Sequence, residues 1–273
     1  SLVALDDISL EISEPGIYGF VGPNGSGKSL IFKTILGFLK PDSGQVFVHG
    51  KKLRKDVLFA EDTGYSMVEY AALADKTGRQ NLELMDILAS EKHDLDKLLR
   101  YVGLDPNNQR TYKEYSLGMK QRLLLAMAML SDPSLLIFDE PTNALDEDGQ
   151  EFLKRLVLEQ RKRGKTLLIS SHDKTFITDV ADKIYYVSEG RIKKEAVNCD
   201  EKIRRIKALS ASDSSCWLWF RQVSCSFGMK MQRWPDSIKS FAAAQRLERK
   251  FPASRLRLNA TSKRSNRRRF ISN

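Results

Sequence analysis

The sequence predicts an α/β fold in which helices cover both faces of a parallel sheet, with an antiparallel β part at the N-terminus and an inserted helical subdomain. Residues 135–138 and 166–170 are two short, mainly apolar runs of the kind found in strands buried on both faces. The segment between them, residues 150–162, has the apolar spacing of an amphipathic helix. This alternation of buried strand and helix is typical of a parallel sheet.

The remaining elements follow from local patterns. Residues 29–39 fit a helix that stops before Pro41. Apolar side chains at spacings of three and four predict the helical subdomain over about residues 75–130. Alternating or short apolar runs predict strands at residues 4–12, 16–21 and 45–48 and a closing hairpin at residues 184–187 and 190–192.

Length and composition restrict the class of protein. A chain of 273 residues allows one large domain, or one domain of roughly 200 residues with an appendage. The longest uninterrupted apolar run, residues 123–130, is eight residues long, whereas a membrane-spanning helix needs about 20. The sequence does not open with a secretory signal pattern, so we expect a cytoplasmic protein.

The charge is distributed unevenly. The chain carries a net charge of +10, but residues 1–200 contain 27 Lys/Arg and 31 Asp/Glu, whereas residues 201–273 contain 18 and 4. The basic pI therefore describes the C-terminal part, and no specific nucleic acid partner is expected for the main domain. We divide the chain into a domain at residues 1–205 and a basic tail at residues 206–273.

The tail lacks the periodicity of helices and strands. Its aromatic residues cluster at 217–220, and it ends in a basic run at 263–269. We expect a disordered extension, and an arm for a membrane surface or nucleic acid is the alternative. Translation in a shifted frame would also produce such a change of composition. The cysteines, Cys199, Cys216 and Cys225, show no metal-ligand spacing.

The strongest motif is Gly22-Pro23-Asn24-Gly25-Ser26-Gly27-Lys28-Ser29, which lies between an expected strand and an expected helix. It matches the phosphate-binding loop of P-loop NTPases. Glycines let backbone N–H groups turn toward phosphates, and the helix N-terminus adds positive potential. Lys28 would reach the β and γ phosphates of a nucleotide, and the hydroxyl of Ser29 would bind Mg²⁺.

Two carboxylates, Asp139 and Glu140, follow the apolar run at residues 135–138. Ligands of open α/β sheets bind at the carboxyl ends of the strands. Asp139 can therefore hold Mg²⁺, directly or through water, and Glu140 can orient or deprotonate a water molecule that attacks the γ phosphate.

Together with the segment Tyr115-Ser116-Leu117-Gly118-Met119-Lys120-Gln121-Arg122, these motifs resemble the ATP-binding cassette (ABC) family of transporter ATPase subunits. The segment is similar to the family's signature motif, Leu-Ser-Gly-Gly-Gln, and opens a helix. The resemblance covers roughly residues 1–200. It implies binding of ATP with Mg²⁺ and ATP hydrolysis coupled to transport, as in bacterial drug and peptide exporters.

The resemblance also implies roles for individual residues. The Ser116 hydroxyl and the Gly118 N–H would meet the γ phosphate that the opposite subunit of a head-to-tail dimer holds. His172 resembles the switch histidine that contacts the γ phosphate, and residues 143–146 resemble the D-loop. Glu69 is the best counterpart of the Q-loop glutamine, which would place it near the metal ion.

The signature, the D-loop and the Q-loop each depart from the family pattern. Leu117 and Met119 replace the usual Gly and Gln of the signature, Asn143 stands where the D-loop usually has serine, and Glu69 replaces glutamine. The aromatic residue that stacks on adenine would precede Ser1, so we expect the chain to begin inside the domain.

The implied partners are a separate transmembrane permease subunit and a second ATP-binding subunit, as a homodimer or heterodimer. The protein would then be cytoplasmic and peripheral on the inner face of the cell membrane. Two alternatives stay open: a soluble ABC-type ATPase that acts on ribosomes or DNA, and an inactive cassette that serves as a binding module. One cassette without sustained heptads favours the transporter subunit over the former, and the presence of Lys28, Asp139, Glu140 and His172 argues against the latter.

Overall fold

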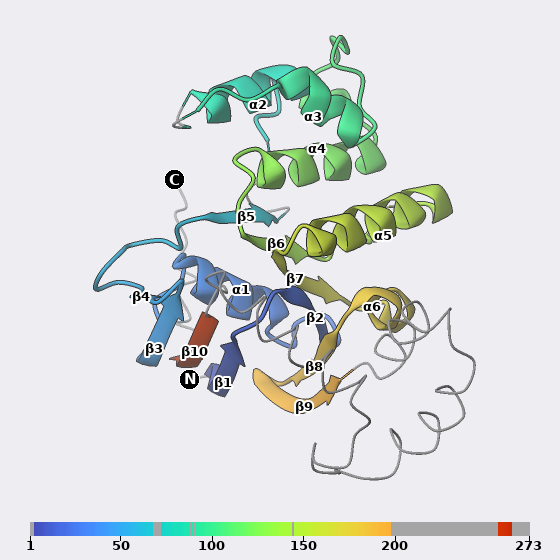
Figure 1. Ribbon diagram of the computed structural model, residues 1–273. Coiled ribbons are helices and arrows are strands. Elements are labelled where there is room, and N and C mark those ends of the chain that lie inside the picture. Colours follow the sequence, from blue (N-terminus) through green and yellow to red (C-terminus); the bar gives the residue numbers. More distant parts are fainter. Residues whose placement is uncertain are drawn as a thin grey trace, which may run out of the picture. The chain divides into compact units, whose positions relative to one another are not determined.

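A computed structural model describes residues 3–67, 72–87, 89, 91–143, 145–197 and 256–263. They form a four-stranded sheet in the order β1-β10-β3-β4 and a six-stranded sheet in the order β5-β6-β7-β2-β8-β9 (Figure 1). The strands are β1 (Val3–Ile12), β2 (Gly16–Val21), β3 (Ser43–Val48), β4 (Lys51–Lys52), β5 (Thr63–Ser66), β6 (Leu135–Asp139), β7 (Thr166–Ser171), β8 (Lys183–Ser188), β9 (Arg191–Val197) and β10 (Leu256–Lys263). The helices are α1 (Lys28–Leu36), α2 (Gly78–Asp86), α3 (Leu95–Tyr101), η2 (Tyr112–Glu114), α4 (Leu117–Met129), α5 (Glu147–Lys162) and α6 (Lys174–Val180).

The six-stranded sheet has the predicted parallel arrangement. The five strands from β5 to β8 pair in parallel, and only β9 pairs antiparallel, in a hairpin with β8. Successive residues of the central strands belong to different cores: Ile137 packs toward β1 and α1, whereas Leu136 and Phe138 pack toward α4, α5 and α6. The continuous apolar runs thus reflect burial on both faces.

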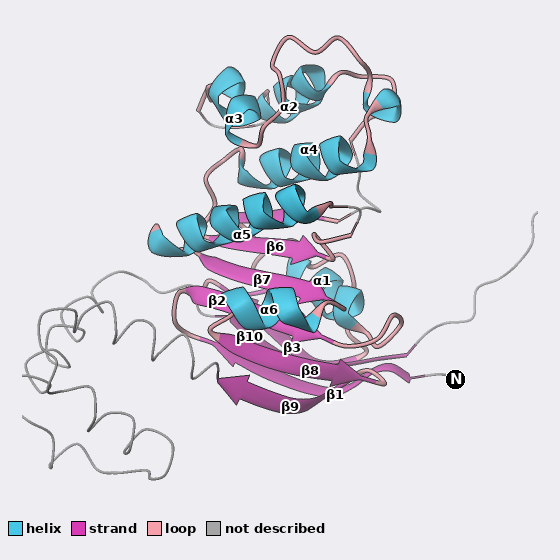
Figure 2. Ribbon diagram, turned by 90° about the vertical axis from the view of Figure 1, so that its right-hand side faces the viewer, coloured by secondary structure: helices cyan, strands magenta, loops and turns pink. Residues whose placement is uncertain are grey.

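Helices cover the two faces as expected of an α/β fold. α5 and α6 contact β2 and β7 on one face, and α1 lies on the other, where it also contacts β1 and β3 (Figure 2). The α/β fold that the sequence predicts, with its antiparallel N-terminal part, is therefore confirmed. The helix predicted at residues 29–39 ends earlier than expected, because Gly37 adopts a left-handed conformation (φ 85°) and its N–H bonds the Thr34 carbonyl.

The helices α2, α3, η2 and α4 occupy the stretch in which the sequence predicts a helical subdomain. Their buried side chains, such as Leu82, Leu99 and Leu123, belong to the same core as Leu136 and Phe138 of β6. The helical part is therefore packed directly on the sheet that carries the phosphate-binding loop. Among the described helices, none is long and apolar enough to span a bilayer.

The C-terminal part departs from the expectation of a disordered tail at Leu256–Lys263. These residues form β10, which pairs antiparallel with β1 on one side and with β3 on the other. The segment alternates Leu256, Leu258 and Ala260 with polar residues, which is the pattern of a strand with one buried face. The rest of the predicted tail lies outside the described residues.

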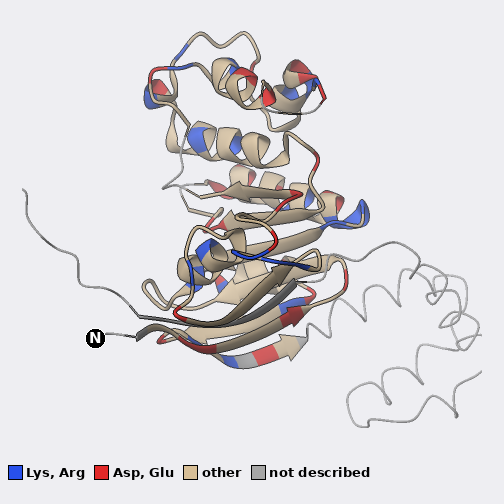
Figure 3. Ribbon diagram, turned by 90° about the vertical axis from the view of Figure 1, so that its left-hand side faces the viewer, with Lys and Arg blue, Asp and Glu red and all other residues tan. Residues whose placement is uncertain are grey.

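Charged side chains of both signs are distributed over the described elements. Figure 3 shows Lys and Arg interspersed with Asp and Glu on the helical part and along the strands. Some of them pair across the fold: the carboxylate of Asp182 accepts a bond from the N–H of Ile17 and forms an ion pair with Arg161, which is 10% exposed. These contacts attach the end of α5 and the start of β8 to β2.

Candidate functional site

The phosphate-binding loop joins β2 to α1, as the motif predicts. Gly25 (φ 79°) and Gly27 (φ 110°) adopt left-handed conformations that side chains other than glycine rarely tolerate. Gly27 is the N-cap of α1 and has no side chain to bond the first N–H groups of the helix. A loop with these features presents free N–H groups at a helix N-terminus, which is an anion-binding arrangement.

The β8–β9 hairpin contacts the phosphate-binding loop and supports it. The N–H of Gly190 donates to the carbonyl of Ser26 over 2.9 Å, and a Cβ at Gly22 would lie 2.1 Å from the carbonyl oxygen of Val187. Gly22 therefore has to be glycine because the loop packs directly against the β8 backbone. This rigid support explains how a loop of six residues without regular structure holds one conformation.

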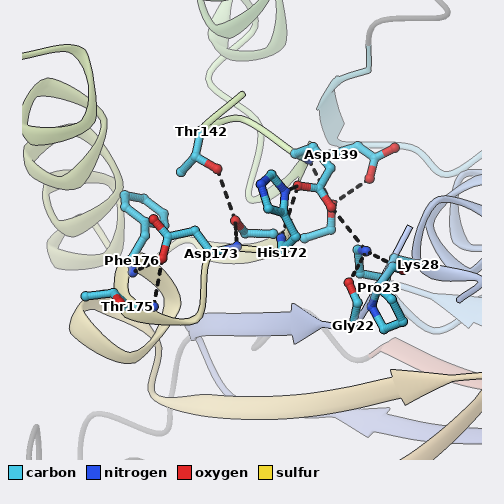
Figure 4. A network of polar contacts seen from close by, with 12 residues as sticks. Gly22, Pro23, Lys28, Asp139, Thr142, His172, Asp173, Thr175 and Phe176 are labelled. Carbon is cyan, nitrogen blue, oxygen red and sulfur yellow. Dashed lines mark hydrogen bonds and ion pairs between the residues drawn. The ribbon is translucent and has the colours of Figure 1, made fainter. Parts of the chain in front are cut away.

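Lys28 reaches across the loop to the end of β6. Its Nζ lies 2.6 Å from the carbonyl oxygen of Gly22, 3.2 Å from that of Pro23 and 3.1 Å from Oε1 of Glu140. Lys28 is 4% exposed, so water does little to compensate its charge. Among the described residues, these three oxygen atoms alone compensate it. Figure 4 shows Lys28, Asp139 and His172 converging at one place.

Glu140 and His172 form the second half of the cluster. Nδ1 of His172 lies 2.9 Å from Oε2 of Glu140, and the His172 N–H also donates to this oxygen over 3.2 Å. Glu140 has a left-handed backbone (φ 50°), which is strained for a non-glycine residue and turns the chain directly after β6. Strain of this kind persists only where the surroundings enforce it, and here β6 and β7 do so.

Ser170 at the end of β7 holds both carboxylate residues. Its hydroxyl donates to Oδ1 of Asp139 over 2.5 Å and accepts the N–H of Glu140 over 2.8 Å. The residue is fully buried. The sequence motifs do not single out Ser170. Its position at the end of a parallel strand, adjacent to the strand of Asp139, is the feature that indicates a role in the site.

Two polar atoms of the site lack a hydrogen-bond partner among the described residues. They are Oγ of Ser26, a residue that is 4% exposed, and Oε1 of Glu140, whose only contact is the ion pair with Lys28. Buried polar groups are normally satisfied. Their location beside the loop fits a site that is completed by a polar ligand.

The residues present also fit a magnesium ion. Ser29 supplies a hydroxyl at the start of α1 and Asp139 a carboxylate at the end of β6, and Mg²⁺ prefers such oxygen donors together with phosphate and water. In the described ranges, no group of three or more His, Cys, Asp or Glu is arranged to hold a metal ion by itself, and a metal ion shared with a nucleotide does not need one. Glu69, the third predicted ligand, lies outside the described residues.

The signature residues lie apart from this cluster. Ser116 is the N-cap of α4; its Oγ accepts the N–H of Met119 over 3.2 Å, and it is exposed, as is Leu117 with 66% of its surface. No contact in the described part of the chain joins Ser116 or Gly118 to Lys28 or Glu140. A helix N-terminus with an exposed hydroxyl can bind an anion that approaches from outside the subunit.

The predicted D-loop begins three residues after Glu140. The N–H of Asn143 donates to the carbonyl of Glu140 over 3.1 Å, and Asp146 caps α5 by accepting the N–H of Gly149 over 2.9 Å. Asp146 thus has a structural role that the motif alone did not reveal.

Comparisons with known proteins agree with this site. Residues 5–143 match the family model described as ABC transporter. The chain is 36% identical over 191 residues to an uncharacterized ABC transporter ATP-binding protein, YybJ, of Bacillus subtilis, covering 69% of this chain and 87% of YybJ. It is 37% identical over 199 residues to the bacitracin transport ATP-binding protein BcrA of Bacillus licheniformis, covering 70% of this chain and 64% of BcrA.

A solved structure shares the fold. The dimeric structure of MJ0796, a bacterial ABC transporter cassette, matches with a TM-score of 0.65 at 25% identity, over 71% of this chain and 90% of that chain. Fold, motif order and relatives lead to the same assignment. The chain belongs to the ABC transporter family, as one of its ATP-binding ATPase subunits.

Proposed function

We propose that two ATP-binding subunits close around two ATP molecules, each bound between the phosphate loop of one subunit and the signature of the other, and that hydrolysis reopens them. The observation that carries this proposal is the convergence of Lys28, Glu140 and His172 at the loop between β2 and α1. The separate, exposed location of Ser116 supports the second half of it, because a γ phosphate held by a partner subunit can reach that side chain.

Each residue of the cluster has a distinct task. The N–H groups at the start of α1 and the Lys28 ammonium bind the β and γ phosphates. Glu140 accepts a proton from the attacking water, and His172, bonded to Oε2 of Glu140, holds this carboxylate in place and contacts the γ phosphate. Ser170 fixes the backbone that carries both acids.

Mg²⁺, held by Ser29 and Asp139, would neutralise phosphate charge when it is bound with ATP. The hydrogen bond from Ser170 orients the Asp139 carboxylate toward that task. We place Glu69 near the same ion on the strength of its position in the sequence.

A membrane-embedded permease subunit is the partner that we propose, with the protein on the cytoplasmic face of the membrane. Apolar side chains are exposed at the end of α2: Leu84 (43%), Met85 (38%) and Ile87 (68%). Leu73 is also exposed, with 51% of its surface. Exposed apolar side chains on the helical part are consistent with a protein contact there. The relative BcrA is a bacitracin transport ATP-binding protein. This relative suggests that the cargo is a peptide antibiotic.

Substitution of Lys28 tests the site. Lys28→Ala removes the charge that faces the phosphates, so ATP binding in the presence of Mg²⁺ should be lost at concentrations that saturate the unchanged protein. Lys40→Ala, an exposed lysine just beyond α1, is the matched control and should bind normally. Equal ATP affinity of Lys28→Ala and Lys40→Ala in a binding titration would refute the assignment of the loop.

A further inference from the structure

The side chain of Tyr115 connects the start of α2 to the residue before the signature serine. Its hydroxyl accepts the N–H of Gly78 over 3.2 Å, and Tyr115 is 5% exposed. Gly78 is the first residue of α2, so its N–H has no partner within the helix. A Cβ at Gly78 would lie 2.7 Å from the Tyr115 hydroxyl oxygen, so this contact needs glycine at position 78.

Backbone hydrogen bonds join the same two segments. The N–H of Tyr112 donates to the carbonyl of Lys76 over 2.8 Å, and the N–H of Lys113 donates to that of Ala74 over 3.0 Å. Thr77 and Thr111 form an isolated antiparallel bridge. Residues 73–78 and 111–115, which we call the clamp, are therefore held together by contacts of Ala74, Lys76, Thr77 and Gly78.

Asn81 secures the clamp from the α2 side. This residue is 3% exposed; its Oδ1 accepts the N–H of Leu73 over 2.7 Å, and its Nδ2 donates to the carbonyls of Thr77 over 2.9 Å and Leu73 over 3.2 Å. A buried amide whose donors and acceptor are all used fixes the loop in one conformation.

Within the described part of the chain, Ser116 itself is anchored only locally. It is exposed, and its hydrogen bonds run to Met119 and Lys120 of its own helix. The place of its hydroxyl therefore depends on the start of α4 and on Tyr115, the buried residue that precedes it. A shift of about 1 Å in a group that contacts the reacting phosphate is enough to impair turnover.

We propose that Tyr115 is a positioning residue for Ser116, acting through its hydroxyl bond to Gly78, and that Asn81 supports it by ordering the clamp. The inference rests on the proposed function, in which Ser116 contacts ATP bound to the partner subunit. It predicts a defect in dimer closure and turnover that leaves ATP binding by the same subunit's own loop intact.

Tyr115→Phe tests the proposal because it keeps the ring and removes only the acceptor of the Gly78 N–H. Tyr112→Phe is the matched control: Tyr112 is the neighbouring buried tyrosine, and its ring contacts with Tyr115 and Lys120 survive the change. Both are made in the full chain, with and without Glu140→Gln, which lets ATP-bound dimers accumulate. Asn81→Asp is a second variant, which replaces the Nδ2 donor by an oxygen facing three carbonyls.

For Tyr115→Phe we expect the dimer dissociation constant in ATP, measured by sedimentation, to rise about ten-fold, and turnover at saturating ATP to fall about ten-fold. ATP affinity of the monomer should change less than two-fold, and Tyr112→Phe should match the parent protein. Asn81→Asp should show the same split between dimerisation and monomer affinity.

Dimerisation of Tyr115→Phe equal to that of Tyr112→Phe would overturn the proposal, as would a parallel loss of monomer ATP affinity, which indicates a general structural defect. Ser116→Arg, measured alongside, separates this failure from that of the proposed function. If Ser116→Arg dimerises normally, the trans role of the signature is wrong. If it does not dimerise while Tyr115→Phe does, only the role of Tyr115 is wrong.

Discussion

Glu140→Gln should slow ATP hydrolysis and, at the same time, tighten ATP binding. The amide cannot accept a proton from water, so turnover should fall by about 10²-fold or more. The gain in affinity follows from the contact between Lys28 and Glu140, in which Nζ and Oε1 lie 3.1 Å apart and the side chains are 5% and 16% exposed. We therefore expect Glu140 to compete with the phosphates of ATP for the Lys28 ammonium.

The magnitude can be worked from that contact. Glutamine carries no charge, so Glu140→Gln removes the ion pair with Lys28, and an ion pair of this kind contributes up to about 1 kcal/mol. The carboxylate's repulsion of the γ phosphate is removed as well. At about 1.4 kcal/mol per factor of ten, we expect ATP to bind about five-fold more tightly.

The assay is a titration with a fluorescent ATP analogue at a protein concentration low enough to avoid dimers, together with steady-state phosphate release. Glu151→Gln, an exposed glutamate on α5, is the control and should leave both unchanged. Normal turnover of Glu140→Gln would remove this residue from its role as base. Weaker binding of ATP would show that the ion pair does not restrain Lys28.

Two further predictions concern Ser170 and β10, whose roles are visible in the structure but not in the sequence motifs. Ser170→Ala leaves the Glu140 N–H without an acceptor and frees Asp139, so the rate of hydrolysis should fall about ten-fold. The unfolding temperature should fall by several degrees, because an unsatisfied buried donor costs about 1–3 kcal/mol. Ser188→Ala is the control, and equal rates of hydrolysis would contradict the role of Ser170. Removal of residues 254–273 takes β10 out of a sheet in which it has seven register pairs with β1 and six with β3. Its loss should cost several kcal/mol of a total near 5–15 kcal/mol, seen as a much lower unfolding temperature, and unchanged thermal unfolding of the shortened chain would exclude β10 from the sheet.

Much of the site could be predicted because its residues follow buried strands. The run that ends at Asp139 and Glu140 and the run that ends before His172 form adjacent parallel strands, so their carboxyl ends meet. Lys28 had to lie near them because its loop follows β2, which is paired with β7. Local pattern plus one rule about parallel sheets was enough for this cluster.

Other features depend on contacts between segments that the local pattern does not contain. β5 went unrecognised because Thr63–Ser66 has no apolar run; Gly64 lets it approach α4 so closely that a Cβ there would lie 1.8 Å from the Ala128 carbonyl. β10 was missed because its short alternation lies in a basic, irregular context. The clamp joins segments about 37 residues apart, partly through the Tyr115 hydroxyl and partly through backbone atoms, and local sequence patterns do not indicate such distant contacts.

The shared active site is the central claim, and a mixed dimer tests it most directly. Lys28→Ala disables a subunit's loop but leaves its signature sound, whereas Ser116→Arg does the reverse. Mixing the two, with Glu140→Gln in both chains, should rebuild one complete site per heterodimer. We predict that the mixture forms ATP-dependent dimers more readily than either variant alone. Dimerisation of the mixture no better than that of the separate variants would contradict the assignment of Ser116 and Gly118 to the partner's ATP.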